Sequence, residues 1–212
     1  MAKTIFLVRH GESQANVGTH YEDAGASLTE KGREQARFIA QRVLKLTVDV
    51  LLSSTMGRAR ETTEFIAEAI GKEPEFSDLF IERRYPSSLV GLEKKSIEGR
   101  ELFGTWTDSC LHGGSRVLDG ENFDDIKTRA LRCLELLQTR QEQNILIVMH
   151  GHFMRYLCAA AIYGEALTPE IYAPLHTGLR VNNTGLTVLH FDDDDQHSKW
   201  WVSVWNDHAH LG

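Results

Sequence analysis

Three residues near the amino terminus have the types and the order needed to react with a phosphoryl group. Arg9, His10 and Gly11 directly follow the apolar run TIFLV of residues 4–8. A neutral imidazole attacks phosphorus readily, and the ordinary histidine pKa of about 6.5 leaves much of it neutral in a cell. Arginine offers a planar fork that matches phosphate oxygens in pairs, and glycine lets the backbone approach an anion closely. The pattern makes His10 the candidate nucleophile and Arg9 a candidate phosphate ligand.

The other parts of such a site occur farther along the chain. Phosphoryl transfer to histidine also needs positive charge around the phosphate oxygens and an acid for the leaving oxygen. Arg58 follows a second apolar run, and His150 follows another, so both are candidate phosphate ligands. Asn16, on the loop after the candidate nucleophile, is a candidate amide donor. Glu82 is the carboxylate best placed to be the general acid, because it comes directly after a short predicted strand.

Three further residues are candidate substrate contacts by their position in the chain. Gly151 directly follows His150, and Arg83 and Arg84 directly follow the candidate acid; a solvent-facing role for these two arginines is the alternative. His150 and His152 could also share a metal ion, but no cysteine or carboxylate stands near them at zinc-ligand spacing. We therefore expect no metal and no other cofactor.

The apolar runs alternate with helical patterns along most of the chain. Such alternation predicts an α/β domain with a mostly parallel sheet, in which ligands bind at the carboxyl ends of the strands. The residue pairs 9–10, 53–54 and 150–151 should therefore converge at one edge of the sheet. We expect strands at 4–8, 48–52, 75–81 and 144–149, a closing hairpin of 186–191 and 199–204, helices after a capping box at 27–30 and at 58–70, 123–137 and 153–163, and an irregular segment at 83–121.

These motifs, in this order, resemble the histidine phosphatase superfamily, also called the phosphoglycerate mutase-like family. The resemblance implies a three-layer α/β/α sandwich in which His10 is phosphorylated during turnover. It also implies that Arg9, Arg58 and His150 form the phosphate pocket and that Glu82 is the proton donor. We expect one domain over residues 1–212, with residues 83–121 as a cap that selects the substrate. The matching stretches are residues 7–16 with the RHG motif, 28–36 (LTEKGREQA), 53–62, 82, 120–121 and 150–155.

The segment after the candidate acid separates two activities within this family. Residues 82–85 (ERRY) are similar to a stretch of the cofactor-dependent mutases, but Pro86 stands where those mutases carry glycine. Their paired-arginine segment has no counterpart in residues 87–121, and the glycine–tryptophan segment of many phosphatases is missing too. We expect a metal-independent phosphatase that acts on a small phosphomonoester, with a phosphoglycerate mutase as the alternative. A non-catalytic phospho-ligand binding protein is disfavoured, because every reactive position is filled.

Composition limits the partners and the compartment. The formal net charge of −7 and pI of about 5.8 argue against a nucleic-acid or anionic-membrane surface, so we expect a small phosphorylated substrate as partner. The apolar run before Arg9 is too short for a signal peptide or a membrane span, which predicts a cytoplasmic location. Three cysteines without metal-type spacing predict buried free thiols. The sequence leaves the oligomeric state, a homodimer included, open.

Overall fold

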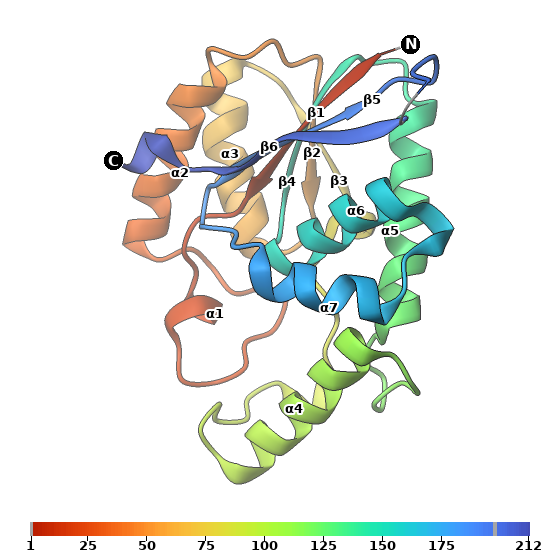
Figure 1. Cartoon of the computed structure of the whole chain (residues 1–212). Helices are drawn as coiled ribbons and strands as arrows, with labels where there is room; N and C mark the ends of the chain where they lie inside the picture. Colours follow the sequence, from red (N-terminus) through yellow and green to blue (C-terminus); the bar gives the residue numbers. More distant parts are fainter. Residues whose placement is uncertain (1, 197–198) are drawn as a thin grey trace.

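A central sheet organises the computed structural model, which describes residues 2–196 and 199–212 (Figure 1). Its strands lie in the order β3-β2-β4-β1-β5-β6, and the first four of these run parallel. β5 and β6 form an antiparallel hairpin at one edge, as the sequence predicts. The strands are β1 (Lys3–Arg9), β2 (Val50–Ser54), β3 (Pro74–Ser77), β4 (Asn144–Met149), β5 (Leu186–Phe191) and β6 (Trp200–Asp207).

Strand β1 shows why these apolar runs form the interior of the sheet. Successive side chains of a strand point to opposite faces, so a strand covered on both sides must be apolar at every position. Ile5 and Leu7 pack into the core on one face, and Phe6 and Val8 into the core on the other. β1 is parallel to β4, with Leu7 opposite Ile147.

Helices cover both faces of the sheet and complete the expected three-layer sandwich. Figure 1 shows α2 and α3 on one side of the sheet, and α5 and α6 on the other. The helices are α1 (Gln14–Val17), α2 (Glu30–Val43), α3 (Gly57–Ile70), α4 (Ile97–His112), α5 (Phe123–Thr139), α6 (Gly151–Tyr163) and α7 (Pro169–Gly178), with 3-10 turns at Asp78–Phe80, Ser87–Leu89, Gly164–Ala166 and Ala209–Leu211.

The segment of residues 83–121 is not irregular, which corrects the prediction from sequence. It contains α4, whose N-cap Ser96 accepts a hydrogen bond from the backbone N–H of Gly99. Of the large side chains of α4 only Trp106 is buried, so the apolar periodicity that reveals a helix is weak here. Figure 1 shows α4 apart from the sheet, beyond the carboxyl ends of the parallel strands.

The second strand lies at residues 50–54 and not at 48–52, and three smaller points also differ from the sequence analysis. The third strand ends at Ser77, because the Ser77 hydroxyl accepts a hydrogen bond from Leu79 N–H and starts a 3-10 turn. Helix α2 is capped by Thr29, whose hydroxyl accepts from Gly32 N–H, and not by Ser27. Helix α7 was not predicted.

The three cysteines are buried free thiols, as predicted. Among the described residues, none of the helices has the length and apolar character required of a membrane span.

Candidate active site

The carboxyl ends of three parallel strands bring the predicted residues together. His10 follows β1, Ser54 ends β2 and His150 follows β4. The Nε2 atom of His150 lies 2.8 Å from the hydroxyl of Ser54, and the rings of His10 and His150 are 5.0 Å apart. The predicted convergence at one sheet edge is therefore confirmed.

His10 is buried and held as a neutral imidazole. Its Nδ1 atom lies 2.6 Å from the carbonyl oxygen of Gly11, and since a carbonyl only accepts, Nδ1 carries the proton. Nε2 accepts a hydrogen bond from Nε of Arg58 at 3.2 Å. Burial, followed by the positive charges of Arg58 and Arg9, holds the pKa of His10 well below its ordinary value. Nε2 is therefore unprotonated, and its lone pair can attack phosphorus once Arg58 Nε turns its hydrogen bond to another acceptor.

Two glycines allow the segment of residues 28–36 to pack directly against the loop that follows His10. A Cβ atom on Gly11 would lie 2.4 Å from the carbonyl oxygen of Gly32, and one on Gly32 would lie 1.9 Å from that of Glu12. No real side chain fits at such distances, so the first turn of α2 packs directly on the backbone after His10. Thr29 joins the two segments, because its N–H donates to the Glu12 carbonyl at 2.9 Å.

Two of the predicted phosphate ligands, Arg9 and His150, each have a buried nitrogen without a partner. The Nε atom of Arg9 and the Nδ1 atom of His150 are both inaccessible and make no hydrogen bond. Arg58 is 7 % exposed, and its Nη2 contacts only the sulfur of Met56. Buried polar groups are almost always satisfied, so an unpaired guanidinium N–H of Arg9 beside the nucleophile indicates a place for an anion. Arg9, His10 and Arg58 line a cleft of about 660 Å³.

Asn16 and Gly151 also line this cleft. The amide oxygen of Asn16 accepts from both the N–H and the hydroxyl of Ser13, each at 3.1 Å. Its amide nitrogen is thus the group that can donate to a ligand. Gly151 begins α6 next to Arg9, where a Cβ atom would lie 3.3 Å from the Arg9 side chain.

Glu82 lies at the edge of the same cleft, fixed against the start of α6. Its carboxylate accepts from the backbone N–H groups of His152 at 3.1 Å, Phe153 at 2.9 Å and Arg83 at 3.0 Å. These contacts leave the carboxyl one direction in which to exchange a proton with a ligand. The geometry suits a residue that gives or takes a proton, although Glu82 follows a 3-10 turn and not the strand itself.

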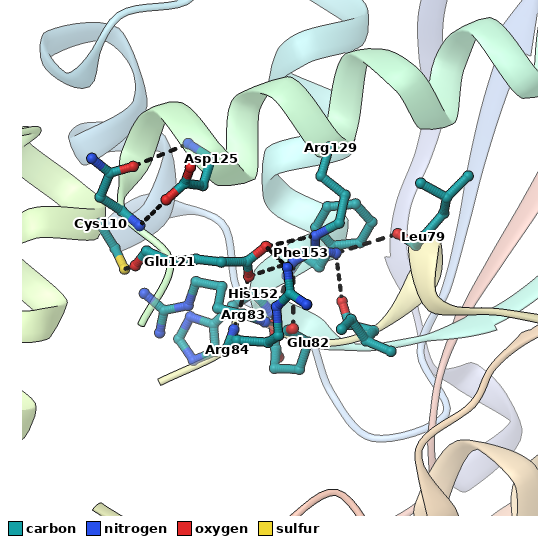
Figure 2. A network of polar contacts seen from close by, with 12 residues as sticks. Leu79, Glu82, Arg83, Arg84, Cys110, Glu121, Asp125, Arg129, His152 and Phe153 are labelled. Carbon is teal, nitrogen blue, oxygen red and sulfur yellow. Dashed lines mark hydrogen bonds and ion pairs between the residues drawn. The ribbon is translucent and has the colours of Figure 1, made fainter. Parts of the chain in front are cut away.

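A buried ion pair holds the chain segment that carries Glu82 (Figure 2). Arg129 on α5 donates to both carboxylate oxygens of Glu121, at 2.9 and 2.8 Å. The same guanidinium donates to the carbonyl oxygens of Leu79, Ile81 and Glu82, at 3.3, 2.8 and 3.4 Å. We call residues 79–84 the acid loop. The sequence analysis did not identify Arg129. It included Glu121 in a family motif but assigned no role to it.

The two arginines after Glu82 lie in different places. Arg83 lines the cleft, is 4 % exposed and packs over the ring of Trp106 at 4.8 Å. Arg84 does not line this cleft; its side chain is 62 % exposed and lies 3.5 Å from Glu121. The structure thus brings Arg83 to the candidate site and leaves Arg84 outside it.

Several residues that line the cleft were not predicted as part of the site. The sequence analysis included Arg155 in a family motif but assigned it no role. Its position one helical turn after Gly151, on a predicted helix, could have placed it at the site. No signal in the sequence pointed to the cleft residues of α7, since that helix was not expected. The additional lining residues are Ala15, Tyr21, Glu22, Tyr85, Lys94, Phe103, Trp106, His152, Arg155, His176, Thr177, Arg180 and Val181. Over residues 2–196 and 199–212, no group of three or more metal-ligating side chains occurs.

Comparison with known proteins gives consistent matches over nearly the whole chain. The model of the histidine phosphatase superfamily (branch 1) matches residues 5–207. Proteins named "Probable phosphoglycerate mutase GpmB" from Photorhabdus laumondii and Serratia proteamaculans are 32% and 30% identical to this chain, with 95% of this chain and 89% of each relative covered.

Solved structures share the fold at lower identity. Mycobacterial glucosyl-3-phosphoglycerate phosphatase has a TM-score of 0.76 at 22% identity, covering 97% of this chain and 99% of that one. Phosphoserine phosphatase from Entamoeba histolytica, solved with phosphoserine, has a TM-score of 0.77 at 21% identity, covering 99% of both chains.

Proposed function

Because the chain belongs to the histidine phosphatase superfamily and is an enzyme of that class, we propose that it hydrolyses a small phosphomonoester through a phosphohistidine on His10, without a metal. One observation carries this proposal. The neutral, buried His10 presents its Nε2 atom among the cations of Arg9 and Arg58, which have no carboxylate partner among the described residues. Such a nucleophile and charge clamp are what phosphoryl transfer requires.

The reaction runs in two steps. In the first, Nε2 of His10 forms a bond to phosphorus while the ester P–O bond breaks, and Glu82 gives a proton to the leaving oxygen. Arg9, Arg58 and His150 bind the phosphoryl oxygens, with Nε of Arg58 moving its hydrogen bond from Nε2 to an oxygen. In the second, water attacks phosphorus, Glu82 takes its proton, and the P–N bond breaks to return the electron pair to Nε2.

Asn16, Gly151 and Arg83 complete the proposed set of substrate contacts, since all three line the cleft. The segment of residues 83–121 acts as the cap, because Arg83, Tyr85, Lys94, Phe103 and Trp106 come from it to the cleft. The negative net charge supports the absence of a nucleic-acid partner, and the buried free thiols support a cytoplasmic location.

A phosphoglycerate mutase is the second candidate, favoured by the names of the 32% and 30% identical relatives. A mutase must hold a doubly phosphorylated intermediate away from water while it reorients. In this chain Lys94 is the one cationic cap residue after position 87 that lines the cleft, and its ammonium already donates to two carbonyls, of Ala15 and Gly18. The cap after position 87 therefore adds no free cation to that of Arg83, which supports transfer to water over transfer back to the substrate.

A rapid-quench experiment tests the proposed function. Wild-type protein mixed briefly with a phosphomonoester carrying labelled phosphate should retain acid-labile label, and His10→Ala should retain none. His208→Ala, which removes an exposed histidine outside the cleft, is the matched control and should label as the wild type does. Turnover by a folded His10→Ala variant would contradict the proposal. Interconversion of 2- and 3-phosphoglycerate faster than phosphate release, stimulated by 2,3-bisphosphoglycerate, would promote the mutase.

A further inference from the structure

The cleft holds more positive charge than one phosphate group can balance. Six cationic side chains and two carboxylates line it, an excess of about four positive charges, whereas a phosphomonoester supplies about two negative ones. Its five arginines form no ion pair within the described part of the chain. Seven arginines elsewhere each pair with a carboxylate. Eight of the fifteen arginines form no ion pair among the described residues, and five of these eight line the cleft, in a chain whose net charge is −7.

Part of this excess lies on Arg83, away from His10. Its Nε and Nη1 atoms are inaccessible and have no hydrogen-bond partner. One side of its guanidinium is covered by Trp106, and its charge acts on the nearby Cys110 thiol. An uncompensated buried cation is expensive, so a folded chain that keeps one in a cleft is prepared for an anionic ligand.

Three side chains of α6 and α7 belong to the same region. The rings of His152 and His176 stack at 5.0 Å, and Nη1 of Arg155 lies 3.4 Å from Nδ1 of His152. The pKa of both imidazoles is lowered mainly by burial, that of His176 to about 4, so they are neutral donors or acceptors at pH 7. We call Arg83, His152, Arg155 and His176 the distal cluster.

Glu82 places the distal cluster on the leaving-group side of the reaction. Its carboxylate accepts from the backbone N–H groups of both Arg83 and His152, so it stands directly beside the cluster. If Glu82 protonates the leaving oxygen, the leaving alcohol must extend from that carboxyl into the cleft. A group on that alcohol, and not the transferred phosphoryl group, is then the natural ligand of Arg83.

We propose that the distal cluster is a second anion subsite, and that the substrate is a phosphomonoester whose alcohol carries a second acidic group, a carboxylate or a phosphate. This inference rests on the proposed function, because the role of Glu82 defines the leaving-group side. Arg83 provides the charge-assisted hydrogen bonds, Arg155 adds a second cation, and the two neutral imidazoles provide further polar contacts without additional charge.

The test compares aryl phosphates that differ in one remote group. Phenyl phosphate with a 3-carboxymethyl substituent is measured against its 3-carbamoylmethyl isostere, which has nearly the same shape and leaving group but no charge. A 3-phosphonomethyl analogue distinguishes a phosphate-type from a carboxylate-type ligand. We expect kcat/KM for the better of the two acids to exceed that of the amide by about tenfold or more, as charge-assisted hydrogen bonds allow.

Variants assign the effect to the cluster. Arg83→Met should remove most of the acid-to-amide ratio, and Arg155→Met should remove a smaller part of it, so a misfolded first variant does not end the test. Arg84→Met removes the same charge one residue away, outside the cleft, and should keep the wild-type ratio.

Hydrolysis of all three esters by the wild type at equal kcat/KM would overturn the subsite while leaving the proposed function intact. A high ratio that persists in folded Arg83→Met would also overturn it, since general attraction by the cleft would then explain the preference. Failure to form phosphohistidine with any ester would instead refute the proposed function.

Discussion

Replacement of Glu121 by glutamine should both destabilise the chain and slow catalysis, because Glu121 neutralises the arginine that holds the acid loop. Side chains of Glu121 and Arg129 are only 6% and 9% exposed. Glutamine has the same shape, but it removes the negative charge and presents an amide N–H to guanidinium donors. Arg129 would then keep a buried charge without a counterion while still bonded to the carbonyls of the acid loop.

The expected size follows from the burial of the pair. Removal of one partner of a buried ion pair costs about 3–5 kcal/mol. For a chain of this length each kcal/mol lowers Tm by about 2–4 °C, so Glu121→Gln should melt about 6–20 °C below the wild type. A displacement of a catalytic group by about 1 Å can cost about 100-fold in rate. We therefore expect kcat for an alkyl phosphate, which needs a proton donor, to fall by about that factor.

A double variant separates stability from catalysis. Glu121→Leu combined with Arg129→Met replaces the pair with apolar side chains, which removes the unpaired charge and should recover part of the lost Tm. It cannot restore the hydrogen bonds to the carbonyls of Leu79, Ile81 and Glu82. The alkyl phosphate should remain a poor substrate. The kcat for p-nitrophenyl phosphate, whose nitrophenolate leaves without protonation, should change by no more than about threefold.

Thermal melting and steady-state kinetics on the two esters check these expectations. If the double variant hydrolysed the alkyl ester as fast as the wild type, the pair would serve stability alone. A single Glu121→Gln variant with wild-type Tm and wild-type rates would refute the whole argument.

Four further predictions follow from the same structure. Glu82→Gln should slow hydrolysis of alkyl phosphates by about 10²–10⁴-fold and p-nitrophenyl phosphate far less; equal losses in kcat would indicate a binding role. The folded-state pKa values of His10, His150 and His152 lie below the unfolded value, so the unfolded chain binds more protons as pH falls below about 6.5. The free energy of unfolding should then decrease from pH 6.5 to 5 by up to about 1.4 kcal/mol per pH unit for each of them, and a flat Tm over this range would contradict this. Gly32→Ala should cost about 1–3 kcal/mol in chemical denaturation, because its Cβ would lie 1.9 Å from a carbonyl oxygen; unchanged stability would show that the loop after His10 yields freely. Activity should survive prolonged EDTA treatment and be inhibited by vanadate, whereas loss on chelation that a divalent ion reverses would exclude metal-free hydrolysis.

The sequence alone determined the residues whose chemistry depends on their position in one element. His10 and His150 each follow a buried strand, and parallel strands deliver their ends to one sheet edge. Arg58 follows β2, the parallel strand next to β4, on the first turn of a helix, so its place at the same sheet edge as His10 was also predictable. The three-layer fold followed from the alternation of apolar runs with helical patterns, which local hydrophobic periodicity encodes directly.

Tertiary packing decided the rest. Arg83 and Arg84 are equivalent in sequence, and only the path of the acid loop sends the first into the cleft and the second to Glu121. That path depends on Arg129, which contacts carbonyls about 50 residues earlier in the chain. Helix α4 buries a single narrow strip, and α7 brings His176 to His152 from a segment without a clear pattern. Such long-range contacts arise when separate elements pack together, and no periodicity within one element records them.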